Sequence, residues 1–75
     1  MELERALWVV ADVLREGART HRDGEWKRRP AAYHVERAEQ HLRRLRNGDQ
    51  REDNLAHAAV RLLMAVAIRE VADDE

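Results

Sequence analysis

Apolar side chains recur at helical spacing in three stretches of this 75-residue chain, and strand-like alternation is absent from the long connector between the first two. The longest stretch covers about residues 52–71. It begins with acidic residues and an asparagine, as helix N-termini prefer. Its apolar residues form two adjacent stripes, Leu55/Ala59/Leu62/Val66 and Ala56/Val60/Leu63/Ala67. Two adjacent stripes are wider than one partner helix covers, so we expect this helix to be central.

The first stretch predicts a helix over about residues 3–16. One face of this helix carries five apolar residues, Leu3, Leu7, Val10, Val13 and Leu14. Gly17 follows as a natural C-terminal stop. Trp8 and Val9 lie off the centre of that face, which suggests a second contact, for example across a dimer.

The middle of the chain predicts a connector over residues 17–29 and a helix over about 30–46. Asp23-Gly24 is a turn signal in the connector, and Trp26 either plugs the end of the core or stacks on a base. Pro30 suits the first turn of the helix, and Asn47-Gly48 suits its end. A packing seam runs along it through Ala31, Val35, Ala38, Leu42 and Leu45.

These elements predict an all-α fold of three helices in a single small domain spanning residues 1–75. The short link at residues 49–51 makes the last two helices an antiparallel hairpin. A lone three-helix unit would leave apolar surface exposed, so we expect the chain to assemble into a homo-oligomeric bundle, such as a homodimer.

The composition limits which kinds of site and partner we expect for the chain. It has no cysteine, which excludes disulfides and thiolate zinc sites. It also lacks a signal-like or membrane-spanning segment, and we expect a soluble, cytoplasmic protein with no membrane partner. The net charge of −1 divides into −2 over residues 1–14, +5 over 15–46 and −4 over 47–75. The basic middle suits phosphates, although a solvated, salt-bridged surface explains the same pattern.

Histidines and carboxylates gather where the predicted hairpin turns. His41 lies before the end of the second helix, and Asp53 and His57 lie in the first turns of the third. Facing each other, with Asp49 or Glu52 nearby, these groups could hold a divalent cation or orient a water as general base. The alternative is that each histidine only packs beside the core. A second acidic pair, Glu36 and Glu39, falls away from the seam, and we interpret it as a surface feature.

Several short motifs occur in a recognisable order: Gly17-Ala18, Trp26, Gln40-His41-Leu42, Gly48-Asp49 and Asn54-Leu55-Ala56-His57-Ala58. This order, over roughly residues 6–68, resembles a small, mainly phage-associated family, the dATP/dGTP diphosphohydrolase N-terminal domain. That family has Gly-Ala at the end of its first helix, a Trp in the loop, Arg-His-Leu, Gly-Glu and His-Leu-Ala-His-Ala. Gln40 here stands for the Arg, and Asn54 stands for the first His of the last motif.

The resemblance implies hydrolysis of a purine deoxynucleoside triphosphate to a monophosphate and pyrophosphate with a divalent metal, Mg²⁺ or Mn²⁺. His41, Asp53 and His57 occupy the matching catalytic positions. The metal ligands would come from His41, Asp49, Glu52, Asp53 and His57. The nucleotide would be held by Arg19, Trp26, Lys27, Arg28 and Arg29.

Two other functions remain open from the residues. A small helical interaction module, homo-oligomeric and without catalysis, needs only the apolar faces. A nucleic-acid binder would use the basic residues between Arg15 and Arg46, but acidic flanks and only three aromatic residues disfavour it. A relative of the family that binds nucleotide without hydrolysing it is also compatible with so short a chain.

Overall fold

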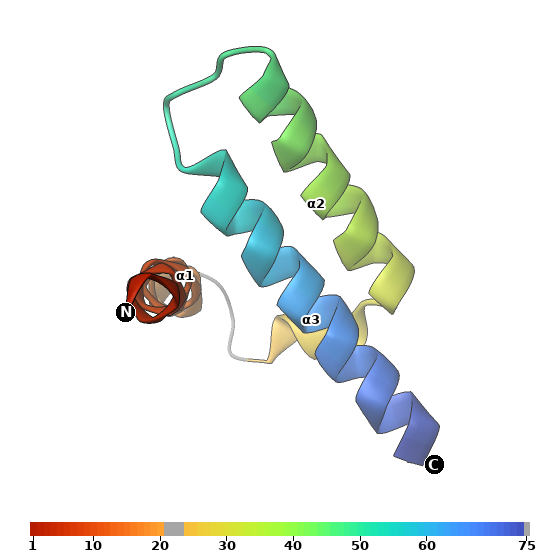
Figure 1. The fold of residues 1–75 in the computed structure, drawn as a ribbon. Coiled ribbons are helices and arrows are strands. Elements are labelled where there is room, and N and C mark those ends of the chain that lie inside the picture. Colours follow the sequence, from red (N-terminus) through yellow and green to blue (C-terminus); the bar gives the residue numbers. More distant parts are fainter. Residues whose placement is uncertain (21–23, 75) are drawn as a thin grey trace.

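The computed structural model describes residues 1–20 and 24–74, with side chains described for 1–18 and 24–70. Three α-helices and one short 3₁₀ helix follow each other along the chain (Figure 1). Their bounds are α1 Glu2–Thr20, η1 Glu25–Arg28, α2 Ala31–Arg46 and α3 Asn54–Asp74. The predicted all-α fold of three helices is confirmed. Within the described residues, no helix is long and apolar enough to cross a membrane.

The first helix is longer than the sequence predicted. It continues through Gly17 to Thr20. Gly17 does not have a positive φ, so it does not form the left-handed cap that would end the helix there. Gly24, with φ of 75°, instead provides the left-handed residue that starts η1. A glycine inside a helix is tolerated at a cost of about 1 kcal/mol relative to alanine.

The predicted hairpin of α2 and α3 forms the centre of the molecule (Figure 1). Small side chains make up its buried apolar core: Ala38, Ala56, Ala58, Val60 and Ala65. Alanines allow the two helix backbones to approach closely, but they bury little apolar area. The same interior holds three buried polar residues, His34, His41 and Asn54. The core is therefore small, and its polar members need hydrogen-bond partners.

The turn between the two helices is fixed by a glycine cap. The N–H of Gly48 donates to the Leu45 carbonyl at 3.1 Å, and the N–H of Asp49 donates to the Arg44 carbonyl at 2.9 Å. Gly48 has a φ of 81°, which L side chains rarely adopt. This pair of bonds is the Schellman arrangement, and it directs the chain back toward α3.

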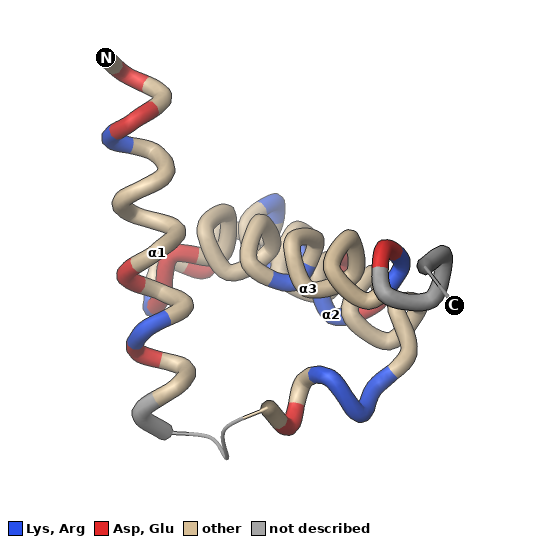
Figure 2. The backbone as a smooth tube through the Cα atoms, turned by 90° about the horizontal axis from the view of Figure 1, so that it is seen from below, with Lys and Arg blue, Asp and Glu red and all other residues tan. Residues whose placement is uncertain are grey.

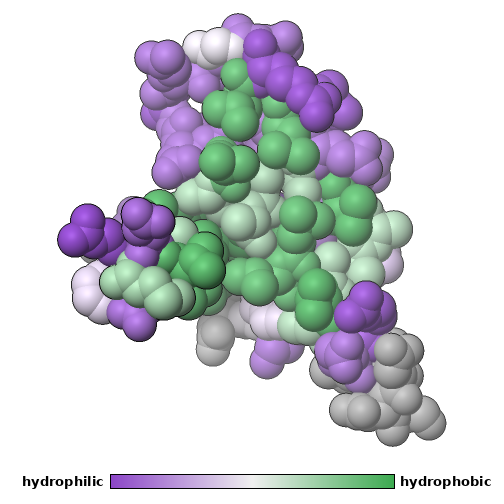
Figure 3. All heavy atoms as spheres, in the orientation of Figure 1, coloured by the Kyte–Doolittle hydropathy of each residue, from purple (hydrophilic) through white to green (hydrophobic). Residues whose placement is uncertain are grey.

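The first helix runs across the hairpin rather than alongside it, and its N-terminal half extends past the hairpin (Figure 2). Its contacts are with α3. The apolar face predicted for it is largely uncovered, with Leu3 68%, Leu7 65% and Leu14 46% exposed. The outer stripe of α3 is uncovered too, with Leu55 60% and Leu62 44% exposed. Apolar side chains consequently gather on one face of the molecule, over α1 and the hairpin (Figure 3).

Candidate functional site

Two groups of polar side chains flank the hairpin interior. One lines a pocket where α1 and η1 meet the hairpin, and the other lies at the turn between α2 and α3. His57 belongs to both groups, because it lines the pocket and stacks on His41 at the turn, with ring centroids 5.1 Å apart.

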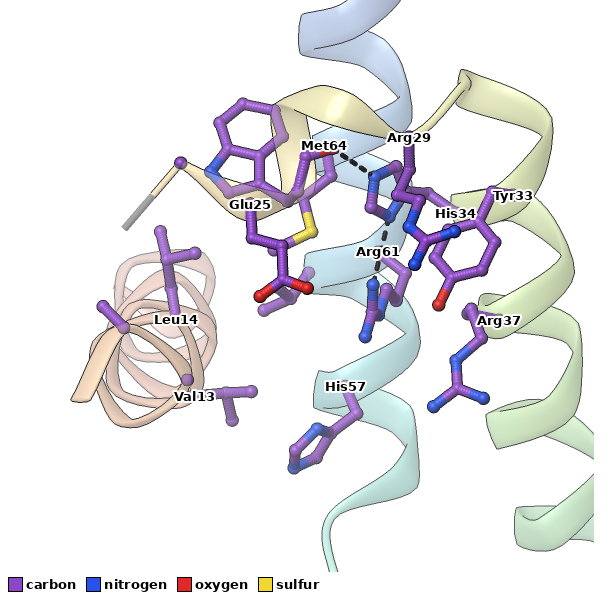
Figure 4. Close-up of a pocket in the computed structure, with 15 residues that line it drawn as sticks. Val13, Leu14, Glu25, Arg29, Tyr33, His34, Arg37, His57, Arg61 and Met64 are labelled. Carbon is purple, nitrogen blue, oxygen red and sulfur yellow. Dashed lines mark hydrogen bonds between the residues drawn. The ribbon is translucent and has the colours of Figure 1, made fainter. Parts of the chain in front are cut away.

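The pocket has a volume of about 330 Å³ and draws its walls from all four elements (Figure 4). Its apolar wall includes Val13 and Leu14 of α1 together with Val60 and Met64 of α3. Its polar wall consists of Glu25, Arg29, Tyr33, His34, Arg37, His57 and Arg61. Trp26 of η1 completes the lining. A pocket that is apolar on one side and cationic on the other suits a ligand with a ring and an anionic group.

His34 holds the polar wall together and is fully buried. Its Nε2 lies 2.9 Å from the Trp26 carbonyl oxygen, and Nη1 of Arg61 lies 3.1 Å from its Nδ1 (Figure 4). A carbonyl only accepts and a guanidinium only donates, so Nε2 carries the proton and Nδ1 accepts. His34 is therefore a neutral imidazole that links η1, α2 and α3, and both of its ring nitrogens are occupied by protein groups.

Arg37 and Arg61 bring two positive charges to the pocket, and neither pairs with a carboxylate among the residues that the structure describes. Arg61 donates to the neutral His34, and Arg37 donates through Nη1 to Gln40 Oε1 at 3.0 Å. The Nε of Arg37 is buried and has no hydrogen-bond partner. Burial and then repulsion from Arg37 lower the pKa of Arg61, against a smaller opposing effect of Tyr33. This part of the pocket consequently favours an anion.

Arg29 adds a third guanidinium beside these two. It lies over the ring of Tyr33, with its central carbon 5.0 Å from the ring centroid. Arg61, on the neighbouring helix α3, also lies over this ring, with the central carbon of its guanidinium 6.0 Å from the ring centroid. Among the described residues that line the pocket, three are arginines and one, Glu25, is acidic. Tyr33 thus keeps two arginines close together through cation–π contacts.

The second group of polar residues is centred on Asn54, which is 1% exposed. Its Nδ2 donates to the Asp49 carbonyl oxygen at 3.2 Å, which fixes the orientation of the amide. Its Oδ1 therefore accepts from Nδ1 of the buried His41 at 2.9 Å. Asn54 joins the turn, the end of α2 and the start of α3 through these two bonds.

Glu52 lies between the two histidines of this group. Its carboxylate oxygens are 3.5 Å from His41 Nδ1 and 3.9 Å from His57 Nε2. Arg44 also approaches Glu52, at 3.4 Å. Among the residues whose side chains are described, no group of three or more His, Cys, Asp and Glu is arranged to hold a metal ion. The carboxylate and imidazoles are near each other, and metal binding at this turn stays a prediction.

The other two predicted acidic ligands are engaged elsewhere. Asp53 caps α3, because its Oδ1 accepts from the Ala56 N–H at 3.0 Å. Asp49 accepts three hydrogen bonds from Arg51, at 3.0, 3.1 and 3.1 Å. These bonds lower the pKa of the Asp49 carboxyl from 3.8 to about 2. The structure thus brings His41, Glu52 and His57 together and uses Asp49 and Asp53 to shape the turn.

The predicted nucleotide-binding residues are also divided. Trp26 and Arg29 line the pocket, whereas Lys27 is absent from the lining and its Nζ lies over the ring of Trp26, 5.8 Å from the ring centroid. Arg28 is exposed and does not line the pocket. The side chain of Arg19 lies outside the described part of the structure.

Sequence reasoning missed two arginines of the pocket, Arg37 and Arg61. A signal for Arg61 was present, because it is one of two polar residues in the apolar run of the last helix. Such an interruption indicates either a surface position or a charge with a function. Arg37 gave no comparable signal, since it is one of many basic residues between 15 and 46.

The family model described as dATP/dGTP diphosphohydrolase, N-terminal, matches residues 3–75. A search of curated proteins and a search of solved structures found no match for the chain.

Proposed function

Since the chain belongs to the dATP/dGTP diphosphohydrolase N-terminal family, which supports a role related to nucleotide hydrolysis, we propose that its pocket binds a purine deoxynucleoside triphosphate. The reaction implied is attack of water on the triphosphate, which breaks the bond between the α- and β-phosphates and releases a monophosphate and pyrophosphate. The observation that carries the proposal is the cationic pocket found in a member of this family.

The charges of the pocket support binding of the phosphates. Arg29, Arg37 and Arg61 present planar guanidinium groups, which match phosphate oxygens in two-bond geometry. Arg37 has an unused buried Nε–H, and Arg61 is repelled by Arg37 when the pocket is empty. A phosphate between the two arginines would accept a hydrogen bond from Arg37 Nε and would reduce the repulsion between the two guanidinium groups. Binding of the anion is therefore expected to raise the pKa of Arg61 again.

The apolar wall supports binding of the base. Trp26 borders the same pocket as Leu14 and Met64, so a flat ring placed there would contact apolar and aromatic surface. The pocket volume of about 330 Å³ lies within the usual range for small ligands. Stacking alone accepts any base, so the purine preference comes from the family.

Hydrolysis requires a group that takes a proton from the attacking water. His57 is the residue best placed for this role, because it lines the pocket and its Nε2 lies 3.9 Å from the Glu52 carboxylate. His41 stacks on His57 and would hold it in place. Mg²⁺ or Mn²⁺, if bound beside this site, would neutralise charge on the phosphates and lower the pKa of the attacking water.

A second candidate function is an interaction module without catalysis. It is favoured by the uncovered apolar residues of α1 and α3, which a nucleotide pocket does not explain. Nucleotide binding distinguishes the two functions, because the interaction module needs no nucleotide.

Calorimetric titration of dATP, dGTP and dTTP, with and without Mn²⁺, tests the proposal. We expect purine triphosphates to bind, and expect Arg37→Gln and Arg61→Gln to weaken binding by roughly tenfold to a hundredfold, the effect of losing one charged hydrogen bond. Arg43→Gln is the matched control, because Arg43 is exposed on α2 and does not line the pocket. Helical circular dichroism of each variant establishes that it is folded.

Two results would refute the proposed site. One is the absence of nucleotide binding to the folded chain. The other is equal loss of affinity in all three arginine variants, which would indicate general attraction to the basic surface. Pyrophosphate release, measured in the same samples and compared with His57→Ala, then tests hydrolysis separately from binding.

A further inference from the structure

We propose that Glu25 selects the base of the nucleotide, and that the pocket prefers guanine to adenine. This role rests on the proposed function, because it takes a purine deoxynucleoside triphosphate to bind in the pocket. It goes beyond that function, since neither stacking on Trp26 nor phosphate contacts to the arginines distinguish one purine from the other. A polar group of the lining that can meet the edge of the base is needed for that distinction.

The carboxylate of Glu25 lies in the pocket apart from the arginines. Figure 4 shows it directed into the pocket on the side nearer α1, whereas Arg29 and Arg37 lie on the side of α2. Among the described residues, no ion pair joins this carboxylate to a guanidinium of the lining. Glu25 is exposed in the empty pocket, so both of its carboxylate oxygens are available to a ligand.

The short helix η1 holds the backbone of Glu25 in place. Gly24 starts it with a φ of 75°, and the Gly24 carbonyl accepts from the Lys27 N–H at 3.1 Å. Nε2 of the buried His34 donates to the Trp26 carbonyl at 2.9 Å, which ties η1 to α2. The His34 ring also meets the Trp26 ring edge-on, with centroids 6.5 Å apart. Because Glu25 and Trp26 are consecutive residues of this fixed element, a base stacked on the tryptophan would present its edge near the carboxylate.

An ionised carboxylate matches the edge of guanine better than that of adenine. Its two oxygens only accept hydrogen bonds. Guanine has two donors side by side on its Watson–Crick edge, the N1–H and the 2-amino group, and can donate to each oxygen. Adenine has its 6-amino donor beside N1, which is an acceptor, so one carboxylate oxygen would face a lone pair. A good two-bond contact to a base distinguishes it from the wrong base by roughly fivefold to a hundredfold.

The charge of Glu25 gives a second reason to place it at the base. A negative charge in a pocket that binds phosphates weakens their binding, and this effect falls with distance and with screening by solvent. An exposed carboxylate away from the arginines therefore disturbs the phosphates least. A neutral base is not repelled, and its N–H donors form stronger hydrogen bonds to a charged acceptor.

Calorimetric titration of dGTP, dATP and dITP into the chain and into Glu25→Gln tests the proposal. The unmodified chain should bind dGTP roughly tenfold more tightly than dATP. Hypoxanthine keeps the N1–H but lacks the 2-amino group, so dITP should fall between them. A glutamine amide can accept from the 6-amino group of adenine and donate to its N1. Glu25→Gln should therefore reduce the ratio of the dATP Kd to the dGTP Kd to about one or below.

The ratio of the two Kd values separates base selection from charge, because both nucleotides carry the same triphosphate. Glu36→Gln is the matched control, since Glu36 is exposed on α2, lies outside the pocket lining and loses the same charge. It should leave the ratio unchanged. Arg61→Gln should weaken binding of both nucleotides by a similar factor and also leave the ratio unchanged, because it removes a phosphate contact.

Each outcome supports or overturns the role of Glu25. A preference for dGTP that Glu25→Gln removes and the other two variants keep supports it. Equal binding of dGTP and dATP to the unmodified chain, or a preference that Glu25→Gln leaves unchanged, overturns this role while the proposed function stands. If no triphosphate binds to the folded chain, the proposed function fails and the role of Glu25 fails with it.

Discussion

Replacing Asn54 by leucine tests whether one buried amide holds the hairpin turn. Leucine has a similar size but no polar atoms, so the change removes the hydrogen bonds of Asn54 to His41 and to the Asp49 carbonyl. Asn54 is 1% exposed, and water cannot replace the lost partners without local opening. The perturbation is therefore electrostatic rather than steric.

The expected loss of stability follows from these two bonds. Each contributes about 1 kcal/mol net, and leaving its buried partner unsatisfied costs about 1–3 kcal/mol. In the variant, Glu52 can partly replace Asn54 as the partner of His41, because its carboxylate lies 3.5 Å from the same nitrogen. The summed loss of stability is therefore expected near the lower end of the range that these values allow. We expect about 2–4 kcal/mol, out of a total stability of roughly 4–11 kcal/mol for a chain of this length. The corresponding fall in Tm is about 10–25 °C.

Urea denaturation followed by helical circular dichroism measures this loss. The protein concentration is kept fixed, because the stability of the homo-oligomer expected from the sequence would depend on it. Gln50→Leu is the matched control, since it is also a polar side chain changed to leucine next to the same turn, and Gln50 is exposed. It should change stability by less than about 0.5 kcal/mol. Equal, small effects of the two substitutions would refute the reasoning, because the buried amide would then contribute nothing.

Two further predictions concern a charged and a neutral group. Asp49 has a folded pKa of about 2 against 3.8 for the free side chain, so its pairing with Arg51 stabilises the fold fully above about pH 4 and is lost as the pH falls toward 2. Asp49→Asn should flatten the stability profile between these pH values, and an unchanged slope in an acid titration by circular dichroism would contradict this. His34→Leu should destabilise the fold by about 2–5 kcal/mol, because it leaves the Trp26 carbonyl and the Arg61 guanidinium without their hydrogen-bond partner. His34→Gln should destabilise the fold less, because its side-chain amide can both donate and accept. Equal melting temperatures for the two His34 variants would argue against both bonds.

The sequence by itself determined the helices and their order. Helical spacing, Pro30 and Asn47-Gly48 predicted the α2 segment, and the short link predicted the hairpin. These features are local, because helix periodicity and a left-handed glycine depend on residues within a few positions of each other. The family resemblance rested on short motifs of the same kind, and the family model confirmed it.

Tertiary structure alone decided what each face meets. The apolar stripe of α1 had the spacing of a core face, yet Leu3 and Leu7 are exposed, because α1 crosses the hairpin and touches only part of it. Spacing states that a face is apolar but not which surface covers it.

The candidate site follows the same division. The sequence could place His41 and His57 near one turn, because a hairpin with a short link has one geometry. The sequence indicated that acidic residues begin the last helix, but it could not show that Asp53 caps this helix rather than binding a metal, or that Asp49 pairs with Arg51. Each carboxylate has several partners within reach of its backbone position. Nor could the sequence show that Arg61 lies beside Arg37. Those two residues lie on different helices, and only the packing of α2 on α3 through alanines sets the separation of their charges.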